Sequence, residues 1–387
     1  KVRGSWAQVG NDTSPYYINS GYSVATYQRG DKKIYGMTIP ENMKSTNLKP
    51  ERKNAWEVGL DWRFFDSRIG VDLTYYKENT RNQIMTINVP WESGVKEKLI
   101  NAGNIQNSGI EIALNTTPIK KKQWQWDLNF TYTRNRNKIV ELSPDVTSYI
   151  NLDGAANYGN YRIASVAKVG SDYGMLMSDS WIKTDEKTGK PVVGYTNKFR
   201  TVYYKRGGTV KEVGSMLPNF LGSLNSTLRW KDLSLYVLFD ARFGGYVASY
   251  NSRYATAYGF SGETEKYRKG MTWTSKYANA QDKVFTDGFI PDVVFDAGTI
   301  VTTPGGTNQD VSGMTYQEAY EKGYVEPAHL QSAAYFKNSW GTGVINDDWF
   351  KKINYIALRE ITLSYNVPTK ISSYIGAKNL SLSFTGR

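Results

Sequence analysis

Residues 123–135 read QWQWDLNFTYTRN, and from Trp124 to Tyr132 every second side chain is aromatic or aliphatic. Gln, Asp, Asn and Thr residues alternate with Trp124, Trp126, Leu128, Phe130 and Tyr132. Successive side chains of a β-strand point to opposite faces, so this stretch predicts a strand with one apolar and one polar face. Aromatic residues toward the ends of such a strand are typical of the two interfaces of a membrane.

The same alternation recurs along the chain. Clear examples are EVGLDWRF (57–64), RIGVDLTYY (68–76), GIEIALN (109–115) and LSLYVLFDARF (233–243). No segment of comparable length carries a clear helical stripe. Together with a strand at 1–9, about nine strands can be counted, with lengths of about nine to fourteen residues. Such strands are longer than is usual in soluble proteins and suit a tilted passage through the hydrocarbon layer.

The connections between these strands alternate in length. Short ones fall near 65–68, 118–123, 231–232 and 367–378, and long polar ones near 10–53, 80–107, 137–216 and 244–352. Short turns at one end of a sheet and long loops at the other are typical of outer-membrane barrels, whereas loops of this length count against a compact soluble domain. The prediction is an all-β, transmembrane antiparallel β-barrel with short periplasmic turns and long extracellular loops.

The polar face of these strands is expected to line the lumen. Its charged members are Asp61, Arg63, Asp72, Asp127, Asp240 and Arg242. We expect them to pair across the wall or against a plug, because an Arg facing lipid at the midplane costs about 2–4 kcal/mol. Trp124, Trp126 and Trp230 are assigned to the interfacial girdle.

One strand departs from this pattern. In YIALREITLSYNVP (355–368), Arg359 has the same parity as Ile361 and its apolar successors, which would point a charge toward lipid. A β-bulge, or a position above the hydrocarbon zone, would resolve the conflict.

Composition excludes several classes of protein. The chain has no cysteine, and its longest apolar segment, 233–239, is too short for a membrane helix. The net charge of +12 arises from scattered basic residues with a single run of three at 120–122, so no nucleic-acid partner is expected.

No enzymatic chemistry or cofactor is expected. His329, the single histidine, stands in EPAHLQS without a recognisable partner spacing, and no phosphate-loop, dinucleotide or H-E-x-x-H motif occurs. Carboxylates that recur in the long connections are Asp282, Asp287, Asp292, Asp296, Asp347 and Asp348. They lack the spacing of a calcium loop and are interpreted as solvated loop carboxylates, so no metal site is predicted.

Aromatic residues in or beside the long connections are the candidate substrate-binding residues. They are Trp181, Tyr250, Tyr254, Tyr258, Trp340 and Trp349. Exposed aromatic rings stack on sugar rings and on peptide side chains. The alternatives are packing within the loops and contact with a lid protein.

Longer segments resemble a known family. They are LKPERKNAWEVGLDWRFFDSRIGVDLTYYKENTRNQI (48–84), LINAGNIQNSGIEIALNTTPIK (99–120), SWAQVGND (5–12), LYVLFDARFGG (235–245) and WFKKINYIALREITLSYNVP (349–368). Together they resemble the corresponding segments of SusC/RagA-type TonB-linked outer-membrane transporters of Bacteroidetes, in the same order. The LKPE, INAG and NSGIE stretches are the most specific.

The resemblance implies a multi-pass barrel of about 22 strands in the bacterial outer membrane, plugged by an N-terminal domain. Such transporters import glycans or peptides with energy delivered by TonB, and a SusD-like surface lipoprotein covers the barrel as a lid. Outer-membrane lipid and lipopolysaccharide would surround the wall. Residues 1–387 are expected to form part of that one barrel domain, namely its later strands and loops, with the plug, the TonB-contacting segment and the terminal strand outside this sequence.

The leading functional hypothesis is therefore active import of an oligomeric nutrient, either glycan or peptide. A soluble extracellular β-rich carbohydrate-binding or adhesion module is the alternative, and a passive porin or a signalling receptor is a third possibility. A sheet that carries its apolar face outward toward lipid would distinguish the importer from the soluble module, because a soluble module packs two layers around a dry centre.

Overall fold

The computed structural model describes residues 1–387 except 20, 90, 102, 144, 145, 147, 148, 153–161, 199, 259, 263–269, 278, 279, 281, 330–344 and 348. Its largest element is a nine-stranded antiparallel sheet whose strands follow one another in chain order. They are β1 (Val2–Asn11), β5 (Glu51–Phe64), β6 (Ile69–Arg81), β9 (Gly103–Lys120), β10 (Trp124–Leu142), β19 (Phe220–Trp230), β20 (Leu233–Ala248), β26 (Phe350–Val367) and β27 (Leu380–Gly386). The predicted number and positions of the strands are confirmed.

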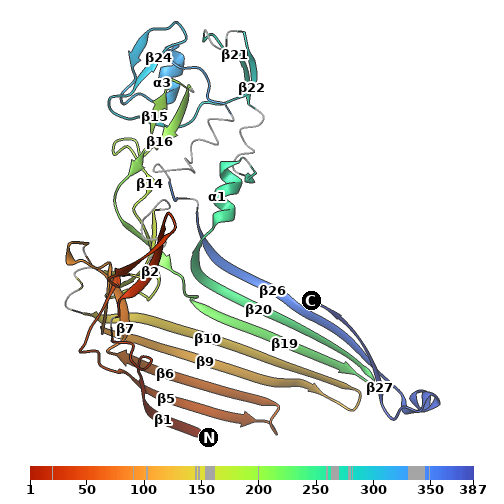
Figure 1. The fold of residues 1–387 in the computed structure, drawn as a ribbon. Coiled ribbons are helices and arrows are strands. Elements are labelled where there is room, and N and C mark those ends of the chain that lie inside the picture. The colour runs from red at the N-terminus through yellow and green to blue at the C-terminus, as the bar shows by residue number, and fades with distance from the viewer. Residues whose placement is uncertain are drawn as a thin grey trace.

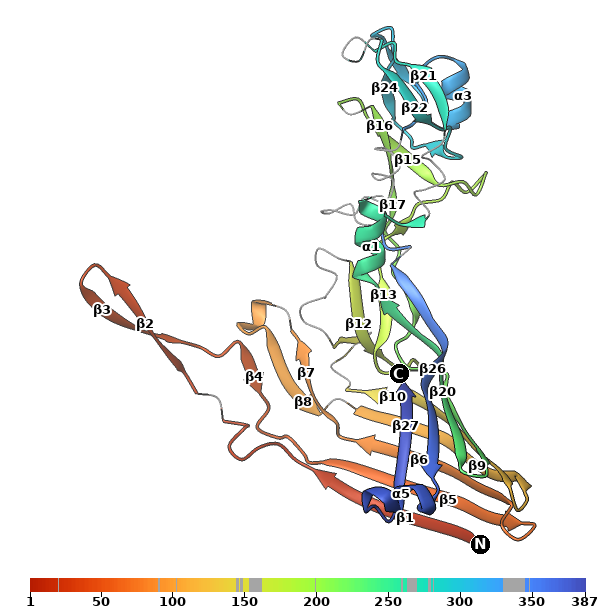
Figure 2. The same ribbon diagram turned by 90° about the vertical axis from the view of Figure 1, so that its right-hand side faces the viewer.

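The sheet is one long, curved and twisted layer (Figures 1 and 2). Its short connections, at 65–68, 121–123, 231–232 and 368–379, all lie at one end. The last of them contains α5 (Thr369–Ser372) and η3 (Ser373–Ile375). The long connections leave from the other end and rise into a separate body (Figure 1). This single layer differs from the two facing layers of a soluble sandwich.

The apolar side chains of neighbouring strands share one face of the sheet. Leu60 of β5 lies opposite Leu73 of β6, which lies opposite Ile112 of β9. Along this face many large apolar side chains are exposed, among them Val58, Trp62, Phe64, Tyr75, Trp124, Phe130, Leu224, Trp230, Leu235, Phe239, Ile356, Leu358, Ile361 and Leu363. An apolar area that runs continuously across several strands is far larger than soluble monomers leave in water, and it fits contact with lipid.

The opposite face is polar and laced with ion pairs. Three arginines pair with aspartates on this face. The distances between guanidinium nitrogen and carboxylate oxygen are 2.9 Å for Arg3 and Asp72, 3.0 Å for Arg229 and Asp127, and 3.0 Å for Arg63 and Asp61. Arg3 reaches Asp72 by lying across Gly59, where a Cβ atom would come within 2.4 Å of its Nε. The predicted pairing of lumen-side charges is confirmed for these carboxylates.

Arg359 occupies a β-bulge. In the pairing of β20 with β26, Leu238 lies opposite Glu360 and Phe239 opposite Leu358, so Arg359 is the extra residue. The bulge turns its side chain to the polar face, where its Nη2 atom donates to Asp240 at 2.8 Å. The structure thus confirms the first of the two predicted solutions.

Aromatic side chains gather at two levels of the apolar face. Trp124 and Trp230 stack at 5.7 Å between ring centroids at the turn end. Toward the long connections, Phe220 contacts Tyr132 at 5.4 Å and Phe243 at 4.8 Å. Trp56 and Tyr75 form a further close pair at 5.4 Å on β5 and β6. Two aromatic levels bordering an apolar band are the signature of a membrane barrel wall.

The first two long connections carry short strands. β2 (Ser23–Arg29) and β3 (Lys32–Thr38) form a hairpin, and β4 (Asn42–Lys44), β8 (Glu97–Asn101) and β7 (Ile84–Asn88) form a three-stranded sheet. Between β7 and β8 lies η1 (Trp91–Ser93). Met85, Ile87 and Ile100 pack on the upper ends of β9 and β10 through Ile105 and Ile139. β7 and β8 are therefore folded onto the wall, whereas the β2–β3 hairpin projects away from it (Figure 2).

The third and fourth connections carry the remaining elements. A four-stranded sheet contains β11 (Tyr149–Asn151), β12 (Ile163–Lys168), β13 (Met175–Ser178) and β18 (Lys211–Ser215). Farther out lie β14 (Trp181–Ile182), β15 (Val192–Thr196), β16 (Thr201–Tyr204), β17 (Arg206–Gly207), α1 (Tyr250–Ala257), β21 (Met271–Thr274), β22 (Val284–Gly288), β23 (Val294–Phe295), β24 (Ile300–Thr302), β25 (Asn308–Asp310) and α3 (Tyr316–Glu321).

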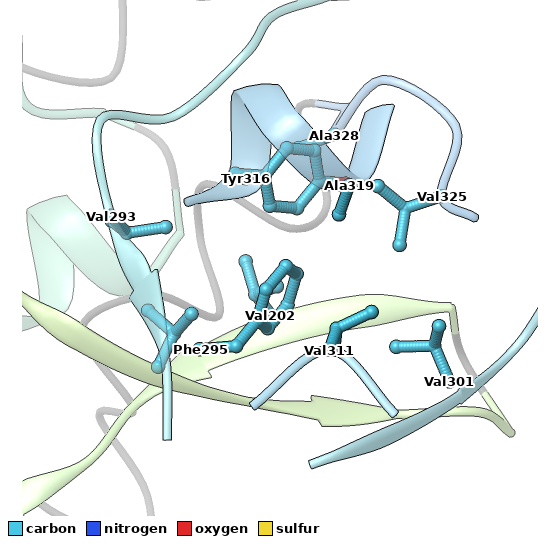
Figure 3. Packing of buried hydrophobic residues seen from close by; sticks show 10 residues of the cluster. Val202, Val293, Phe295, Val301, Val311, Tyr316, Ala319, Val325 and Ala328 are labelled. Carbon is cyan, nitrogen blue, oxygen red and sulfur yellow. The ribbon is translucent and has the colours of Figure 1, made fainter. Parts of the chain in front are cut away.

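We call the described residues of 181–207 and 271–329 the outer subdomain. Its two segments come from different connections and are joined by parallel pairing of β15 with β23. Its core contains Val193, Val202, Phe295, Val301 and Tyr316, each at most 2% exposed (Figure 3). The connections were predicted to be long polar loops, and this packed core is a difference from that expectation.

In the described part of the chain, no helix has the length and apolarity needed to cross a membrane.

Candidate functional site

Three of the candidate aromatic residues meet where the wall joins the long connections. Trp349 lies 5.9 Å from Tyr250, and Trp181 lies 6.0 Å from Phe350, measured between ring centroids. Trp349 is 3% exposed and packs on Ile163. We call Trp181, Tyr250, Trp349 and Phe350 the neck cluster. It draws on β14, the start of α1 and the start of β26, so it fastens the outer subdomain to β20 and β26.

The indole groups of the neck cluster are engaged within the protein. The Nε1 atom of Trp181 donates to the Ser178 carbonyl at 3.0 Å, and the Lys211 ammonium lies 5.4 Å from the Trp181 ring. Trp349 is almost fully covered, whereas Tyr250 keeps 41% of its surface exposed. Of these candidates, Tyr250 is the one whose ring offers the most surface to a ligand.

An apolar pocket of about 550 Å³ opens beside Tyr250. Its wall is formed mainly by Ile163, Leu176, Met216, Tyr246, Tyr250 and Ile353, with Ser165 and Arg242 as polar groups. Clefts of this size, lined by apolar and aromatic groups with a few polar ones, commonly bind small ligands.

Arg242 is the polar anchor of this pocket. Its Nη2 atom donates to the Met216 carbonyl at 3.2 Å, which holds the segment before β19 against the polar face of β20. Its Nε atom is buried and has no hydrogen-bond acceptor among the described residues. Because this Nε atom is closed to solvent, a ligand in the pocket would meet the rest of the Arg242 guanidinium group.

The remaining candidates lie apart from the pocket lining. Tyr258 follows α1 and is 59% exposed, and Tyr254 lies within α1. Trp340 falls outside the described residues. Sequence reasoning did not select Tyr246, Ile353 or Arg242 as ligand contacts, because the pocket exists only once segments from β12, β13 and β20 meet.

The loop carboxylates are engaged in ion pairs and turns rather than in a cluster. Asp296 lies 2.8 Å from the Lys183 ammonium and 3.5 Å from that of Lys205, and Asp292 lies 2.7 Å from that of Lys190. Burial alone would raise the pKa of Asp296, but the hydrogen bond from Lys183 and the charges of both lysines outweigh it and hold this pKa below its ordinary range. The predicted solvation of Asp296 is wrong, since its side chain is only 19% exposed and is paired with two lysines that directly follow β14 and β16.

His329 is part of an aromatic stack in the outer subdomain. Its ring lies 5.3 Å from that of Phe285 and 6.3 Å from that of Trp273. Burial lowers its pKa below the ordinary value, which favours the neutral imidazole at pH 7. Within the described ranges, no group of three or more His, Cys, Asp or Glu side chains is arranged to hold a metal ion.

Comparison with known proteins identifies the class. The family model described as TonB dependent receptor-like, beta-barrel matches residues 1–196, about half of the chain. The chain belongs to this family. Its nine strands are accordingly part of an outer-membrane-type β-barrel wall, and the soluble adhesion module is not favoured.

Individual relatives place the chain within this family. TonB-dependent receptor P26 of Formosa agariphila is 23% identical over 397 residues, which cover 100% of this chain and 34% of that protein. The TonB-dependent receptor SusC of Bacteroides thetaiotaomicron is 28% identical over 180 residues, covering 46% of this chain and 17% of SusC. The chain therefore spans about a third or less of the length of these relatives.

A solved structure supports the fold. The structure of the RagAB peptide transporter superimposes with a TM-score of 0.61 over 99% of this chain and 36% of that one, at 14% identity. The resemblance to SusC/RagA-type transporters is confirmed, and the matched part is the later portion of the barrel.

Proposed function

We propose that this chain forms part of a TonB-dependent importer of an oligomeric nutrient, glycan or peptide, in the bacterial outer membrane. The observation that carries the proposal is the two-faced wall. Its apolar face is exposed between two aromatic levels, its polar face is lined with ion pairs, and all long connections leave from the same end. This arrangement suits a water-filled passage whose mouth is shaped by the long connections.

Residues 1–387 form part of one barrel domain under this proposal. Among the described strands, β1 pairs only with β5 and β27 only with β26, which leaves two open sheet edges. In lipid each unpaired backbone group costs several kcal/mol, so these edges require further strands to close the ring. A plug and a TonB-contacting segment would belong to the rest of the transporter.

The partner at the mouth would be a SusD-like surface lipoprotein. The outer subdomain is a packed body that stands beyond the wall, as Figure 2 makes clear, and so offers a firm surface to a lid. The fold is similar to that of the RagAB peptide transporter, at a TM-score of 0.61, and the resemblance to SusC/RagA-type transporters, which carry such a lid, supports a lid for this chain as well.

Substrate contact is assigned to the apolar pocket and to the exposed aromatic residues near it. Tyr250 would stack on a sugar ring or apolar side chain, and the Arg242 guanidinium group would donate to a substrate oxygen. Tyr254, Tyr258 and Trp340 are retained as proposed substrate contacts. Trp181 and Trp349 would act by holding the neck, since they pack within it.

Import is tested with the complete transporter in a strain that lacks its chromosomal copy. Growth is measured on a panel of polysaccharides and on a peptide digest as the sole carbon source, with and without TonB. We expect growth on at least one substrate class to require both the transporter and TonB. Growth that needs the transporter but is indifferent to TonB would favour a passive porin, and a wild-type protein found in the soluble fraction would overturn the proposal.

The pocket is tested by Tyr250→Ala and Arg242→Gln in the same strain. Because both changes remove a ligand contact, we expect uptake to fall about tenfold at limiting substrate while the amount of folded barrel is unchanged. Ser14→Ala, a change at an exposed loop residue that does not line the pocket, is the matched control. Uptake at the wild-type level in both pocket variants would remove these residues from the site.

A further inference from the structure

The apolar pocket beside Tyr250 offers few hydrogen-bonding groups. Among the described residues that line it, Arg242 and Ser165 are polar, two are tyrosines and the others are apolar. None of these lining residues carries a carboxylate or a carboxamide. The Ser165 hydroxyl is already directed at the Met216 sulfur, at 3.8 Å between Oγ and Sδ. A ligand in this pocket therefore meets mainly apolar surface.

This chemistry separates the two substrate classes. A sugar ring brings several hydroxyl groups, and a hydroxyl group that is buried without a partner costs free energy. A large aliphatic side chain gains free energy roughly in proportion to the apolar area that it buries. The pocket therefore favours an aliphatic side chain over a sugar ring.

Two glycines of β20 let the segment that carries Met216 cross this strand. The φ angle is 85° at Gly244 and 88° at Gly245, where the pairing of β20 with β26 shifts register. A Cβ atom on Gly245 would lie 2.9 Å from the Met216 carbonyl oxygen, and one on Gly244 would lie 2.8 Å from the Asn219 nitrogen. The Asn219 N–H group donates to the Phe243 carbonyl at 2.8 Å. Side chains at the two glycine positions would therefore push Met216 out of place.

Met216 is the adaptable part of the pocket wall. The residue lines the pocket and keeps 44% of its surface exposed. A thioether on an unbranched chain adjusts to apolar groups of different shape. The Met216 backbone, by contrast, is held by the hydrogen bond that its carbonyl accepts from Arg242. The pocket thus combines a fixed position with a deformable surface.

Arg242 is the one charged group among the described lining residues. Asp240, two residues away on the same face of β20, is already paired with Arg359. The Arg242 guanidinium group can therefore donate to a ligand oxygen, and hydrogen bonds from a charged donor are the stronger ones. Every residue of a peptide places a carbonyl oxygen close to its side chain. An aliphatic residue of a peptide thus supplies both groups that this pocket binds.

We propose that the apolar pocket is a specificity site for one large aliphatic side chain of a peptide, and that Arg242 binds an adjacent backbone carbonyl or the terminal carboxylate. Leu176, Met216 and Ile353 would contact the side chain. The inference rests on the proposed function and narrows its substrate from glycan or peptide to peptide. Tyr250 then packs against the bound residue.

The test measures the binding of defined probes to the purified complete transporter by isothermal titration calorimetry. The probes are Gly-Gly-Leu-Gly-Gly, Gly-Gly-Asn-Gly-Gly, maltohexaose and octanoate. Leucine and asparagine side chains are similar in size, so the two peptides differ mainly in polarity. We expect the wild type to bind the leucine peptide about tenfold more tightly than the asparagine peptide. This comparison does not depend on the folding of any variant.

Two pairs of variants locate the site. Met216→Asn places a carboxamide in the pocket, and Met37→Asn on the exposed β2–β3 hairpin is its matched control. Gly245→Ala displaces the Met216 carbonyl, and Gly208→Ala, where an added Cβ atom has no neighbour within 4 Å, is its control. Both pocket variants should bind the leucine peptide about tenfold more weakly, and both controls should bind it as the wild type does. Heat-modifiable mobility verifies that each variant is folded.

Four results would overturn the inference. Two of them are equal binding of the two peptides to the wild type and full affinity for the leucine peptide in folded Met216→Asn protein. Displacement of the leucine peptide by maltohexaose would assign the pocket to a glycan. Octanoate that binds as tightly as the leucine peptide would assign it to a free amphipathic carboxylate. In each of these cases, growth that still requires the transporter and TonB would leave the proposed function intact.

Discussion

The direction of each side chain on the spanning strands decides whether it meets lipid or water. Leu128 faces outward between Thr116 and Ser226, and Asn129 faces inward between Asn115 and Asn225. Two adjacent residues of β10 therefore experience different solvents. The outward Ser226 hydroxyl accepts a hydrogen bond from the Trp126 indole at 3.0 Å, so even an isolated polar group on the lipid side is satisfied.

We predict that Leu128→Arg impairs barrel assembly and that Asn129→Arg does not. An Arg facing the hydrocarbon midplane costs about 2–4 kcal/mol, whereas the same side chain on the lumen face stays hydrated. The measurement is the fraction of complete transporter that shows the heat-modifiable mobility of a folded barrel. Equal fractions for the two variants would show that the assigned facing of β10 is wrong.

Asp296 makes the stability of the outer subdomain depend on pH. Its pKa lies below the ordinary value, so the folded state stabilises the carboxylate, and this contribution is present above the unfolded pKa of about 4. It is lost as the pH falls through the folded pKa. Limited proteolysis of residues 181–207 and 271–329 should therefore accelerate below about pH 4.

The control for this prediction is Asp296→Asn, which cannot be ionised. The outer subdomain of this variant should be cleaved faster than that of the wild type at pH 7. Its proteolysis rate should also change less on acidification. A wild-type proteolysis rate that does not vary between pH 7 and pH 3 would contradict the role of the Lys183 and Lys205 pairs.

At the scale of elements, the bulge in β26 reconciles a sequence conflict with the membrane. The bulge takes one residue out of the ladder, so Leu358 and Ile361 both face outward while Arg359 reaches Asp240. Because the side-chain period of a strand is two, one residue more or less exchanges its faces.

We predict that deleting Arg359 is tolerated about as well as Arg359→Ala, whereas deleting Thr362 is not. The substitution removes one half-exposed ion pair, worth about 1 kcal/mol or less. Deleting Arg359 leaves Leu358 opposite Phe239 and Glu360 opposite Leu238 with no extra residue between them, so both halves of β26 keep their faces. Deleting Thr362, outside the bulge, exchanges the faces of one half of the strand, so that barrel assembly should fail. Folded yield in the outer membrane distinguishes the variants, and a low yield after deletion of Arg359 would mean that the bulge itself is required for assembly.

The strands and their facing could be predicted from sequence because each depends on a local alternation. The sequence shows the alternation of apolar and polar residues from Trp124 to Tyr132 directly. Even the bulge at Arg359 appears in the sequence as a break in this alternation. The neck cluster and the pocket could not be predicted in this way. Trp349, Trp181 and Tyr250 meet through contacts between distant segments, and the connection strands beside them, β12, β13, β14 and β18, have only two to six residues, too few to show a clear period.

At the scale of the whole molecule, the wall and the outer subdomain are stabilised separately. The wall is stabilised by pairing of long strands, and the outer subdomain by Val193, Val202 and Phe295 from two connections. Neither connection contains a complete core. Removing the part contributed by one connection alone would therefore uncover the part contributed by the other.

We predict that replacing 181–207 and 271–329 together by short linkers leaves a folded barrel. Trp181 and Gly207 are paired neighbours, so the first gap is easily closed. Removing 271–329 alone should expose Val193 and Val202 and cause aggregation or proteolysis of what remains. Heat-modifiable mobility reports the barrel and protease resistance reports the loops. A stable protein after the single removal would show that the first segment folds independently.

The parallel pairing of β15 with β23 also fixes an order of events during biogenesis. Val192 cannot pair until Val294 has been synthesised, and the β19–β20 hairpin is synthesised between them. A section of the transmembrane wall is therefore made before the outer subdomain can be completed. Long-range pairing of this kind is slow. The apolar side chains of β15 and β16 therefore stay uncovered until residues 271–329 have been synthesised and can pack against them.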